Sequence, residues 1–469
     1  MAEMDYWTLR KNVSKIVPRM TQLFRERKKV RAVREKGRKS GYKQYNLRTR
    51  EWVKQERLLN TEEVNSFAEI SVRAQACPMP LNLDVWDGLI CPFACKYCYA
   101  NAFRASLYTA FFDNSKTMGF RHCNPSYYKG ELDKLMKHRG KDPQSVPQDV
   151  PRAIAMEIPM RLGIRFEDFL RNEEKEGISL ELLRYLAQED YPVMINTKSD
   201  LVGHEDYLEA LGSNEGRTAV HVTVISSNDQ ILKTLEPGAP PFDKRVEACE
   251  RLAGAGVRPV ARIEPYLVFL CDSPDEVEEY MERMWEAGVR HITFDTYSYT
   301  AHNPGIRQDF INCGVDFERL FLLGCDSQGL GSLLLGKFME LFRERGFSCS
   351  TFDIGNAASN SQTICCEVGD WFQGGWNYGC TVIAARFIKS RGTQPTRWKD
   401  FVEHVEEHGG FLSEALRMDV HRLWNVEGNE AYASNWCQGI EPVGADEDGI
   451  VWHYLEGDDF RERLLEECL

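Results

Sequence analysis

Residues 91–99 read CPFACKYCY and follow the apolar segment LNLDVWDGLI at 81–90. This stretch places three cysteines, Cys91, Cys95 and Cys98, at a C-x3-C-x2-C spacing. Three thiolates can hold three irons of a cubane, and the fourth iron then keeps an open position for a cofactor or substrate. The spacing predicts a four-iron four-sulfur cluster in the loop after the first strand of the fold.

Two other metal sites stay open as alternatives. A structural zinc site needs a fourth Cys or His, and none follows at C-x2-C or H-x3-H spacing within the next twenty or so residues. An electron-transfer cluster also needs a fourth thiolate, for which Cys123 is the candidate.

From Leu81 onward, short apolar segments alternate with amphipathic helical ones. The expected strands are LNLDVW, AIAME, PVMINTK, AVHVTVI, RPVARIEP and HITFDTY. The helical pattern is clear in DKRVEACERLAGAG at 243–256 and SLLLGKFMELFRERG at 332–346. This order is typical of an α/β fold with a parallel sheet, in which about six strand units fit between 80 and 300. Active sites of parallel barrels lie at the carboxyl ends of the strands.

Three regions are expected along the chain. Residues 1–75 read as a polar, helical, appended arm, 76–310 as the core barrel, and 311–469 as a C-terminal barrel-closing or accessory region. A strand is expected in the last region at CTVIAARFI, residues 380–388.

Charge is distributed unevenly. The net charge is −13, yet residues 1–60 hold 18 Lys and Arg against 6 Asp and Glu, a local balance of +12. The run RERKKVRAVREKGRK at 25–39, with Trp7, Tyr42, Tyr45 and Trp52 nearby, favours contact with nucleic acid. The alternative is a solvated helical surface.

Composition limits the class of protein. The chain has 469 residues, 43% of them hydrophobic, which suffices for a large core. No stretch of about 18 apolar residues and no signal-peptide pattern is found, so we expect a cytoplasmic protein with no membrane contact. The odd count of 15 cysteines favours reduced thiols and metal ligands over a disulfide framework.

With these residues in view, the chain resembles the radical S-adenosylmethionine (SAM) superfamily, and within it the spore photoproduct lyase branch. The first matching block is CPFACKYCYA, whose Tyr97 and Tyr99 fit the C-x-Y-C-Y arrangement of the lyases. The second runs over 221–265 and includes EPG, DKR and the AG before the next strand. The resemblance covers roughly 80–300 and implies a partial (β/α)6 TIM-type barrel, the cluster, SAM as cofactor, and a cellular reductant such as flavodoxin or ferredoxin.

The resemblance also implies roles for single residues. The catalytic candidate is Tyr99, which would lie beside SAM and take part in hydrogen-atom transfer. The cofactor-binding candidates are Lys198, Ser199, Thr223, Glu157 and Arg262. Lys198 would contact the SAM carboxylate, a role suited to its compact charge.

Each of these roles has a simpler alternative. Lys198 could be a helix-cap or surface lysine, and Thr223 and Tyr99 could be packing residues. Glu157 could pair with an arginine such as Arg161, and Arg262 with a carboxylate such as Glu264. These alternatives stay open on the sequence.

One departure from the lyases bears on the reaction. Spore photoproduct lyases carry a cysteine that returns hydrogen to the repaired thymine, whereas the corresponding stretch here, PRAIAMEIPM at 151–160, has none. We therefore expect a different reaction from dimer repair, unless another thiol enters the site.

Two further motifs receive a weaker interpretation. Cys349, Cys365, Cys366 and Cys380 could ligate a second cluster or donate hydrogen, but they are first interpreted as structural thiols. The segment GCDSQGLGSLLLG at 324–336 lacks the lysine of a phosphate-binding loop.

The first hypothesis is therefore a radical SAM enzyme that modifies or rearranges a nucleic-acid base. The second keeps the chemistry with a peptide or small molecule as substrate, and the third is a non-catalytic iron–sulfur protein that binds nucleic acid. Lys198, Tyr99 and the EPG segment argue against the third, since a structural cluster needs no SAM pocket.

Overall fold

The computed structural model describes several stretches of the chain and a few single residues between them. These are 4–15, 61–72, 81–88, 91–98, 100, 120–214, 216–297, 311–314, 330–351, 381–407, 421, 424 and 440–455.

The described strands and helices follow one another along the chain in the order expected of repeated β–α units. The strands are β1 Thr61–Val64, β2 Glu69–Val72, β3 Leu81–Asp84, β4 Trp86–Gly88, β5 Phe120–Cys123, β6 Met160–Leu162, β7 Val193–Thr197, β8 Thr218–Thr223, β9 Arg258–Tyr266, β10 His291–Thr296, β11 Ser348–Thr351, β12 Ile440–Asp446 and β13 Gly449–Tyr454. The helices are α5 Pro125–Met136, α6 Asp149–Ala155, α7 Glu173–Glu176, α8 Ile178–Gln188, α9 Glu205–Gly212, α10 Asp229–Leu235, α11 Phe242–Gly254, α12 Pro274–Glu286, α15 Leu330–Glu344, α17 Thr381–Arg391 and α18 Trp398–Glu407, with short 3-10 turns η1 Pro143–Ser145 and η2 Leu201–Gly203.

One large sheet organises the core. Its strand order is β11-β10-β9-β8-β7-β6-β3-β2, and every neighbouring pair is parallel except β2 with β3. The six strands from β3 to β10 in this order are the parallel strands of the expected partial barrel. The predicted α/β class and the parallel sheet are confirmed.

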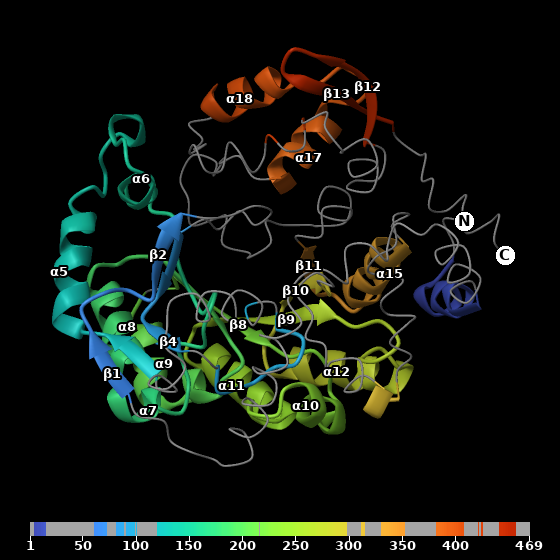
Figure 1. Cartoon of the computed structure of the whole chain (residues 1–469). Helices are drawn as coiled ribbons and strands as arrows, with labels where there is room; N and C mark the ends of the chain where they lie inside the picture. Colours follow the sequence, from blue (N-terminus) through green and yellow to red (C-terminus); the bar gives the residue numbers. More distant parts are fainter. Residues whose placement is uncertain are drawn as a thin grey trace, which may run out of the picture.

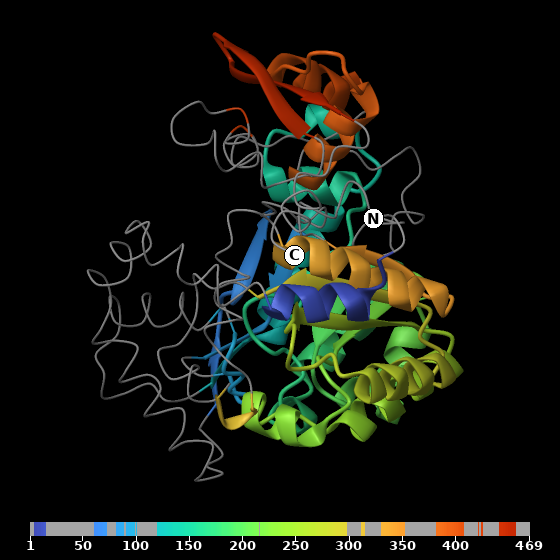
Figure 2. The ribbon, with the colours of Figure 1, turned by 90° about the vertical axis from the view of Figure 1, so that its right-hand side faces the viewer.

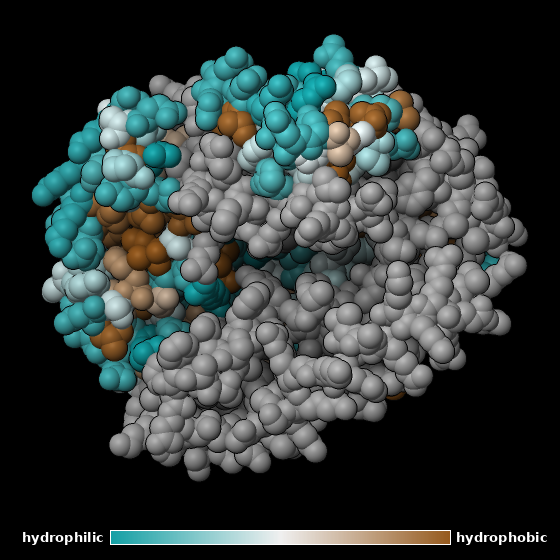
Figure 3. All heavy atoms as spheres, turned by 45° about the horizontal axis from the view of Figure 1, so that its top comes forward, coloured by the Kyte–Doolittle hydropathy of each residue, from teal (hydrophilic) through white to brown (hydrophobic). Residues whose placement is uncertain are grey.

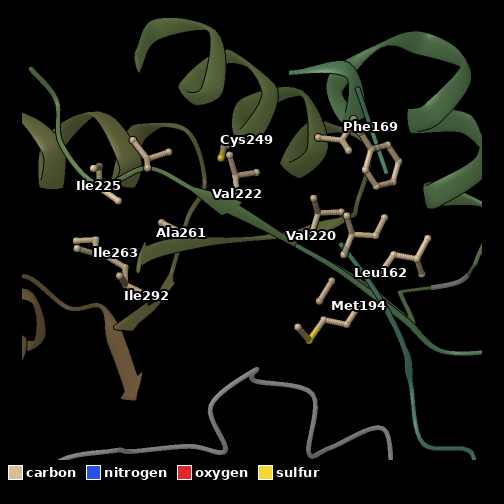
Figure 4. Packing of buried hydrophobic residues seen from close by; sticks show 14 of the residues in the cluster. Leu162, Phe169, Met194, Val220, Val222, Ile225, Cys249, Ala261, Ile263 and Ile292 are labelled. Carbon is tan, nitrogen blue, oxygen red and sulfur yellow. The ribbon is translucent and has the colours of Figure 1, made fainter. Parts of the chain in front are cut away.

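The two faces of this sheet differ in chemistry. Val222 points to the face that the helices cover, where Cys249 of α11 lies beside it (Figure 4), and Val220 and Ile263 belong to the same buried cluster. Helices α8, α9, α11 and α12 lie along this face (Figure 1). The opposite face carries polar side chains, among them Asn196 beside its register partner His221. Because a strand alternates its side chains, one apolar and one polar face divide the barrel wall from its interior.

The N-terminal region differs from the predicted appended arm. Residues 6–15 form a helix whose Tyr6, Leu9 and Val13 are buried in the main core. This helix runs beside α15 in both ribbon views (Figures 1 and 2). Residues 61–72, expected as helix, contain β1 and β2, because strand pairing with β5 and β3 outweighs the local polar pattern.

The boundaries of the core are also wider than predicted. The expected amphipathic helix near 332–346 is confirmed as α15, but α15 and β11 extend the barrel beyond residue 310. The expected strand AIAME is wrong, since Ala153, Ile154 and Ala155 are a buried part of α6. A short apolar run of this kind does not distinguish a buried helix from a strand.

The C-terminal residues form a second, smaller core. The predicted strand at 380–388 is wrong, because α17 occupies it and buries Ala384, Ala385 and Ile388 at helical spacing. α17 and α18 pack on the β12–β13 hairpin around Trp398, Trp424 and Trp452. These elements lie apart from the large sheet (Figure 1).

The face seen in Figure 3 is hollowed near its centre, and described residues inside the hollow are hydrophilic.

None of the helices in the described part of the chain combines the length and apolarity needed to cross a bilayer.

Candidate active site

The three cysteines lie in a compact loop, residues 91–98, which we call the cluster loop. Two backbone hydrogen bonds close it into successive turns, from Ala94 N–H to Cys91 O at 3.0 Å and from Cys98 N–H to Cys95 O at 3.3 Å. Cys95 is buried, while Cys91 and Cys98 are partly exposed. The loop follows β3 and β4, so it lies at the carboxyl end of the sheet.

The thiols are close enough to affect one another electrostatically. Burial raises the pKa of Cys95 well above its usual range, the Lys198 ammonium lowers it, and Glu236, Cys98 and Cys91 raise it further. Binding of a metal requires thiolates and supplies the charge that stabilises them. Three sulfur donors in one loop beside a lysine therefore fit a cluster with one open iron.

Other metal sites find less support. Within the described ranges, no three His, Cys, Asp or Glu side chains converge as on a single metal ion, and this holds for Cys91, Cys95 and Cys98 as well. Cys123, the candidate fourth ligand, lies on β5, where its thiol contacts the carbonyl of Asn124. Burial raises the pKa of Cys123 to about 12, with Glu63 as the neighbouring carboxylate.

Three of the predicted cofactor-binding residues lie in one row across the sheet. Thr223 of β8 is the register partner of Arg262 of β9, and Arg262 is the partner of Thr293 of β10. Lys198 directly follows Thr197, which pairs with Val222. Register partners in a parallel pair leave the sheet on the same side, so this row faces the barrel interior.

The row and the cluster loop meet at Lys198. Its ammonium lies 5.6 Å from the centre of the Tyr97 ring, within the range of a cation–π contact, and it interacts electrostatically with Cys95. A cation here can hold a carboxylate close to the thiols. The predicted contact of Lys198 with SAM stays a prediction.

A buried carboxylate that the sequence reasoning missed holds Lys198 in place. Glu167 accepts hydrogen bonds from the Thr197 hydroxyl at 2.6 Å and from Lys198 N–H at 3.1 Å. Burial raises the pKa of Glu167, and these hydrogen bonds oppose that shift. Its position after the strand β6 was hidden because that strand was predicted one segment too early.

A second missed feature is a pair of buried aspartates near the carboxyl ends of β3 and β6. Asp84 ends β3, Asp168 follows β6, and their carboxyl groups are hydrogen-bonded to each other. Asp84 accepts from Gly163 N–H at 2.9 Å, and Asp168 accepts from Trp86 N–H at 3.0 Å. Burial raises the pKa of both carboxyl groups, and the Asp84 charge raises that of Asp168 further.

Glu157 is a correction. It precedes β6 at the amino end of the sheet, opposite the cluster loop, and binds Arg139 and Arg217, the latter at 3.1 Å. The predicted cofactor role is therefore wrong, because the assumed strand is helix α6. The alternative of an arginine partner was right in kind, but the partner is not Arg161, which binds Asn82.

Two further candidates make contacts within the protein. The Ser199 hydroxyl accepts a hydrogen bond from Leu201 N–H at 3.2 Å, where the chain enters the turn η2. Arg262 donates to Glu264, as the alternative interpretation had it, and Thr293 donates to the other Glu264 oxygen at 2.8 Å. Arg262 still lies in the row that faces the interior.

Several predictions lie outside the described residues. These are Tyr99, residues 16–60 of the basic region 1–60, and Cys365, Cys366 and Cys380. Cys349 is described and is buried on β11, in line with a structural thiol. The strand β6 ends at Leu162, so the segment that follows it toward the site is GIRFED at 163–168, which also lacks cysteine.

Residues 88–269 match the family model described as the radical SAM superfamily. This part of the chain is a radical SAM region. The matched range begins just before the cluster loop and extends just beyond β9, so it contains the loop, Lys198, Thr223 and Arg262. No curated protein sequence matches significantly.

Three solved structures of different proteins match part of the chain at low identity. A spore photoproduct lyase with bound AdoMet and dinucleoside spore photoproduct shares 15% identity over 63% of this chain and 81% of that chain, with a TM-score of 0.43. SuiB from Streptococcus suis, bound to its precursor peptide SuiA, shares 12% over 59% and 49%, with a TM-score of 0.36. The methyltransferase TsrM from Kitasatospora setae shares 11% over 49% and 38%, with a TM-score of 0.32. Likenesses at these scores do not identify the substrate.

The protein is a radical SAM enzyme, with a four-iron four-sulfur cluster and SAM as its cofactors and an external electron donor as a requirement. In this superfamily the two cofactors together supply a deoxyadenosyl radical that abstracts hydrogen from unreactive carbon. The contribution of the chain's own residues is to hold thiols, a cation and hydroxyl groups in fixed positions at one end of the barrel.

Proposed function

We propose that Cys91, Cys95 and Cys98 hold the cluster, that Lys198, Thr223 and Arg262 line the SAM site, and that the enzyme modifies a base in nucleic acid. The observation that carries the first two parts is the row from Lys198 to Arg262, which meets the cluster loop at Lys198. A cation fits the SAM carboxylate, and a strand-end hydroxyl fits its polar groups.

The substrate class rests on the lyase-like sequence blocks and on the basic region. The helix 6–15 leads directly into that region and is held at the carboxyl end of the barrel, on the side of the cluster loop. Tyr6 and Arg10 both bind Asp272, six residues after the end of β9, with Arg10 at 3.0 Å from both carboxylate oxygens. A basic segment that starts here can guide a polyanion toward the site.

Repair of a thymine dimer is not proposed. The segment after β6 has no thiol to return hydrogen, so a modification or rearrangement of a pyrimidine substituent fits the residues better. A thiol at that position is what the lyase reaction demands.

The test compares the wild-type enzyme with a variant in which the nine Lys and Arg of residues 25–39 become Gln. Deletion of residues 1–60 is unsuitable, because it would remove Tyr6, Leu9 and Val13 from the core. The assays are binding of single- and double-stranded DNA and RNA at several salt concentrations, and deoxyadenosine release with each nucleic acid under anaerobic reduction. A control variant carries Gln at surface lysines of other elements, such as Lys134, Lys175 and Lys244.

The proposal expects that one class of nucleic acid accelerates deoxyadenosine release. Only the variant with Gln at the nine basic positions of residues 25–39, which we call the arm variant, should bind that nucleic acid more weakly and with a shallower dependence on salt. Equal affinity and salt dependence in the arm variant and the wild type would remove nucleic acid as the substrate. Stimulation by a peptide or small molecule instead would favour the second hypothesis.

A further inference from the structure

The cluster loop is bound by residues 235–240, which begin with the last residue of α10 and which we call the support segment. Lys96 N–H donates to Leu235 O at 2.8 Å, and Gly238 N–H donates to Phe93 O at 3.2 Å. A Cβ atom on Gly238 would stand 2.1 Å from Pro92 O, so only glycine allows the two backbones to lie this close.

A buried charge pair continues this contact. The Tyr97 hydroxyl donates to Glu236, and Glu236 forms an ion pair with Arg245 of α11 at 2.6 Å. Neither of the paired side chains is accessible to solvent. The EPG and DKR motifs noted in the sequence therefore meet in the structure through Glu236 and Arg245.

Arg245 links the pair to the proposed SAM site. Its Nη1 donates to Thr223 O at 2.9 Å, and its Nε donates to Pro240 O at 2.8 Å. A continuous path of polar contacts thus runs from Tyr97 in the cluster loop, through Glu236 and Arg245, to the carboxyl end of β8.

Burial of two charges is a poor way to gain stability. Desolvation costs several kcal/mol per ion, and apolar replacements of similar volume are often as stable. The pair instead favours one arrangement of the segments that it joins. Any arrangement that separates Glu236 from Arg245 would leave a buried charge without a partner, which costs much free energy in a dry interior.

We propose that Glu236 and Arg245 are positioning residues that set the cluster loop at a fixed place relative to Thr223 at the end of β8. The pair does not touch the reacting groups; it acts through Tyr97 and through the backbone of β8. This proposal rests on the proposed placement of SAM between the cluster loop and the row formed by Lys198, Thr223 and Arg262.

The test uses two variants that avoid an unpaired buried charge. Tyr97→Phe removes one hydroxyl from the path, and the double variant Glu236→Gln/Arg245→Met replaces the ion pair by neutral groups of similar size. The matched control is Tyr207→Phe, since Tyr207 also donates a buried hydrogen bond to a buried glutamate, Glu173, at 2.9 Å.

The measurements are iron content, the KM for SAM, kcat for deoxyadenosine release, and hydrogen exchange of the Lys96 and Gly238 amides in cluster-free protein. Since all three thiols remain, we expect iron near the wild-type level in every variant. Both test variants should raise the KM for SAM about tenfold or more and speed exchange at the two amides by a similar factor. Tyr207→Phe should change neither.

Unchanged KM and exchange in the test variants would overturn the proposal. Equal effects in Tyr207→Phe would also overturn it, because they would show a general loosening of the core. If the wild-type protein bound no SAM, the proposed site would fail, while the exchange rates in cluster-free protein would still decide whether the pair holds the loop.

Discussion

Gly163 offers a sharp test of how the strand ends at the site are assembled. It follows β6 with a positive φ of 78°, and its N–H is shared by the carboxylates of Asp84 and Asp168. A Cβ atom here would stand 1.9 Å from the carbonyl oxygen of Asn196, on β7. Gly163→Ala would therefore push apart the ends of β6 and β7, and Lys198 would move with β7.

The magnitude follows from two separate costs. The left-handed backbone costs an alanine about 1–2 kcal/mol, and overpacking against a fixed backbone adds about 1–3 kcal/mol. We therefore expect Gly163→Ala to lower the free energy of unfolding of the barrel by about 2–5 kcal/mol.

A matched control separates the two costs. Gly140 has a similar φ of 73°, and a Cβ atom added to it would meet no other atom within 4 Å, so Gly140→Ala should show the backbone cost only. The assay is urea unfolding followed by tryptophan fluorescence, together with the KM for SAM, which only Gly163→Ala should raise. If the two variants had the same midpoint and the same KM, the close approach of β6 and β7 would be refuted.

Three more predictions concern charge and docking. Asp168→Asn should flatten the pH dependence of stability. Burial and Asp84 raise the pKa of Asp168 in the folded state, so the unfolded state loses its proton at lower pH than the folded state does. The stability of the wild type therefore falls as pH rises above about 4, the pKa of an aspartate in an unfolded chain. Urea midpoints between pH 5 and pH 8 check this, and a wild-type decline that persists in the variant would contradict it. Lys198→Gln should weaken SAM binding by about tenfold, or about 1.4 kcal/mol, whereas Lys129→Gln, which removes a surface ion pair with Glu181, should not; equal dissociation constants from calorimetry would exclude Lys198 from the site. Asp272→Asn should free the helix 6–15 by weakening its bonds to Tyr6 and Arg10, and faster tryptic cleavage after Arg10 and Lys11 would show it, while an unchanged cleavage rate would argue against this docking.

The sequence predicted the parallel sheet because its strands are bounded by clear helical segments. RPVARIEP became β9 and HITFDTY became β10, each close to its expected limits. The alternation failed at AIAME and at 380–388, where apolar residues fit a buried helix as well as a strand. The error at AIAME placed the carboxyl end of this strand too early in the chain. The sequence analysis therefore chose Glu157, and not Glu167, as the carboxylate near the site.

The candidate site was predictable where chemistry depends on spacing in the chain. The cysteine triplet is local, and Lys198 and Thr223 follow or end readable strands. The Asp84–Asp168 pair joins residues that are distant in sequence, and the Glu236–Arg245 pair joins the turn after α10 to α11. Such pairings depend on strand register and loop paths, which a single sequence does not encode in any local pattern.

The central claim is that the cluster loop holds a catalytic iron–sulfur cluster, and the most direct measurement is anaerobic iron and sulfide content with SAM cleavage after dithionite reduction. The account predicts four irons per chain and deoxyadenosine release in the wild type, with both lost in Cys95→Ala and both retained in Cys123→Ala, whose thiol is buried on β5. Bound zinc, a cluster that never cleaves SAM, or equal loss of iron in Cys123→Ala would contradict it.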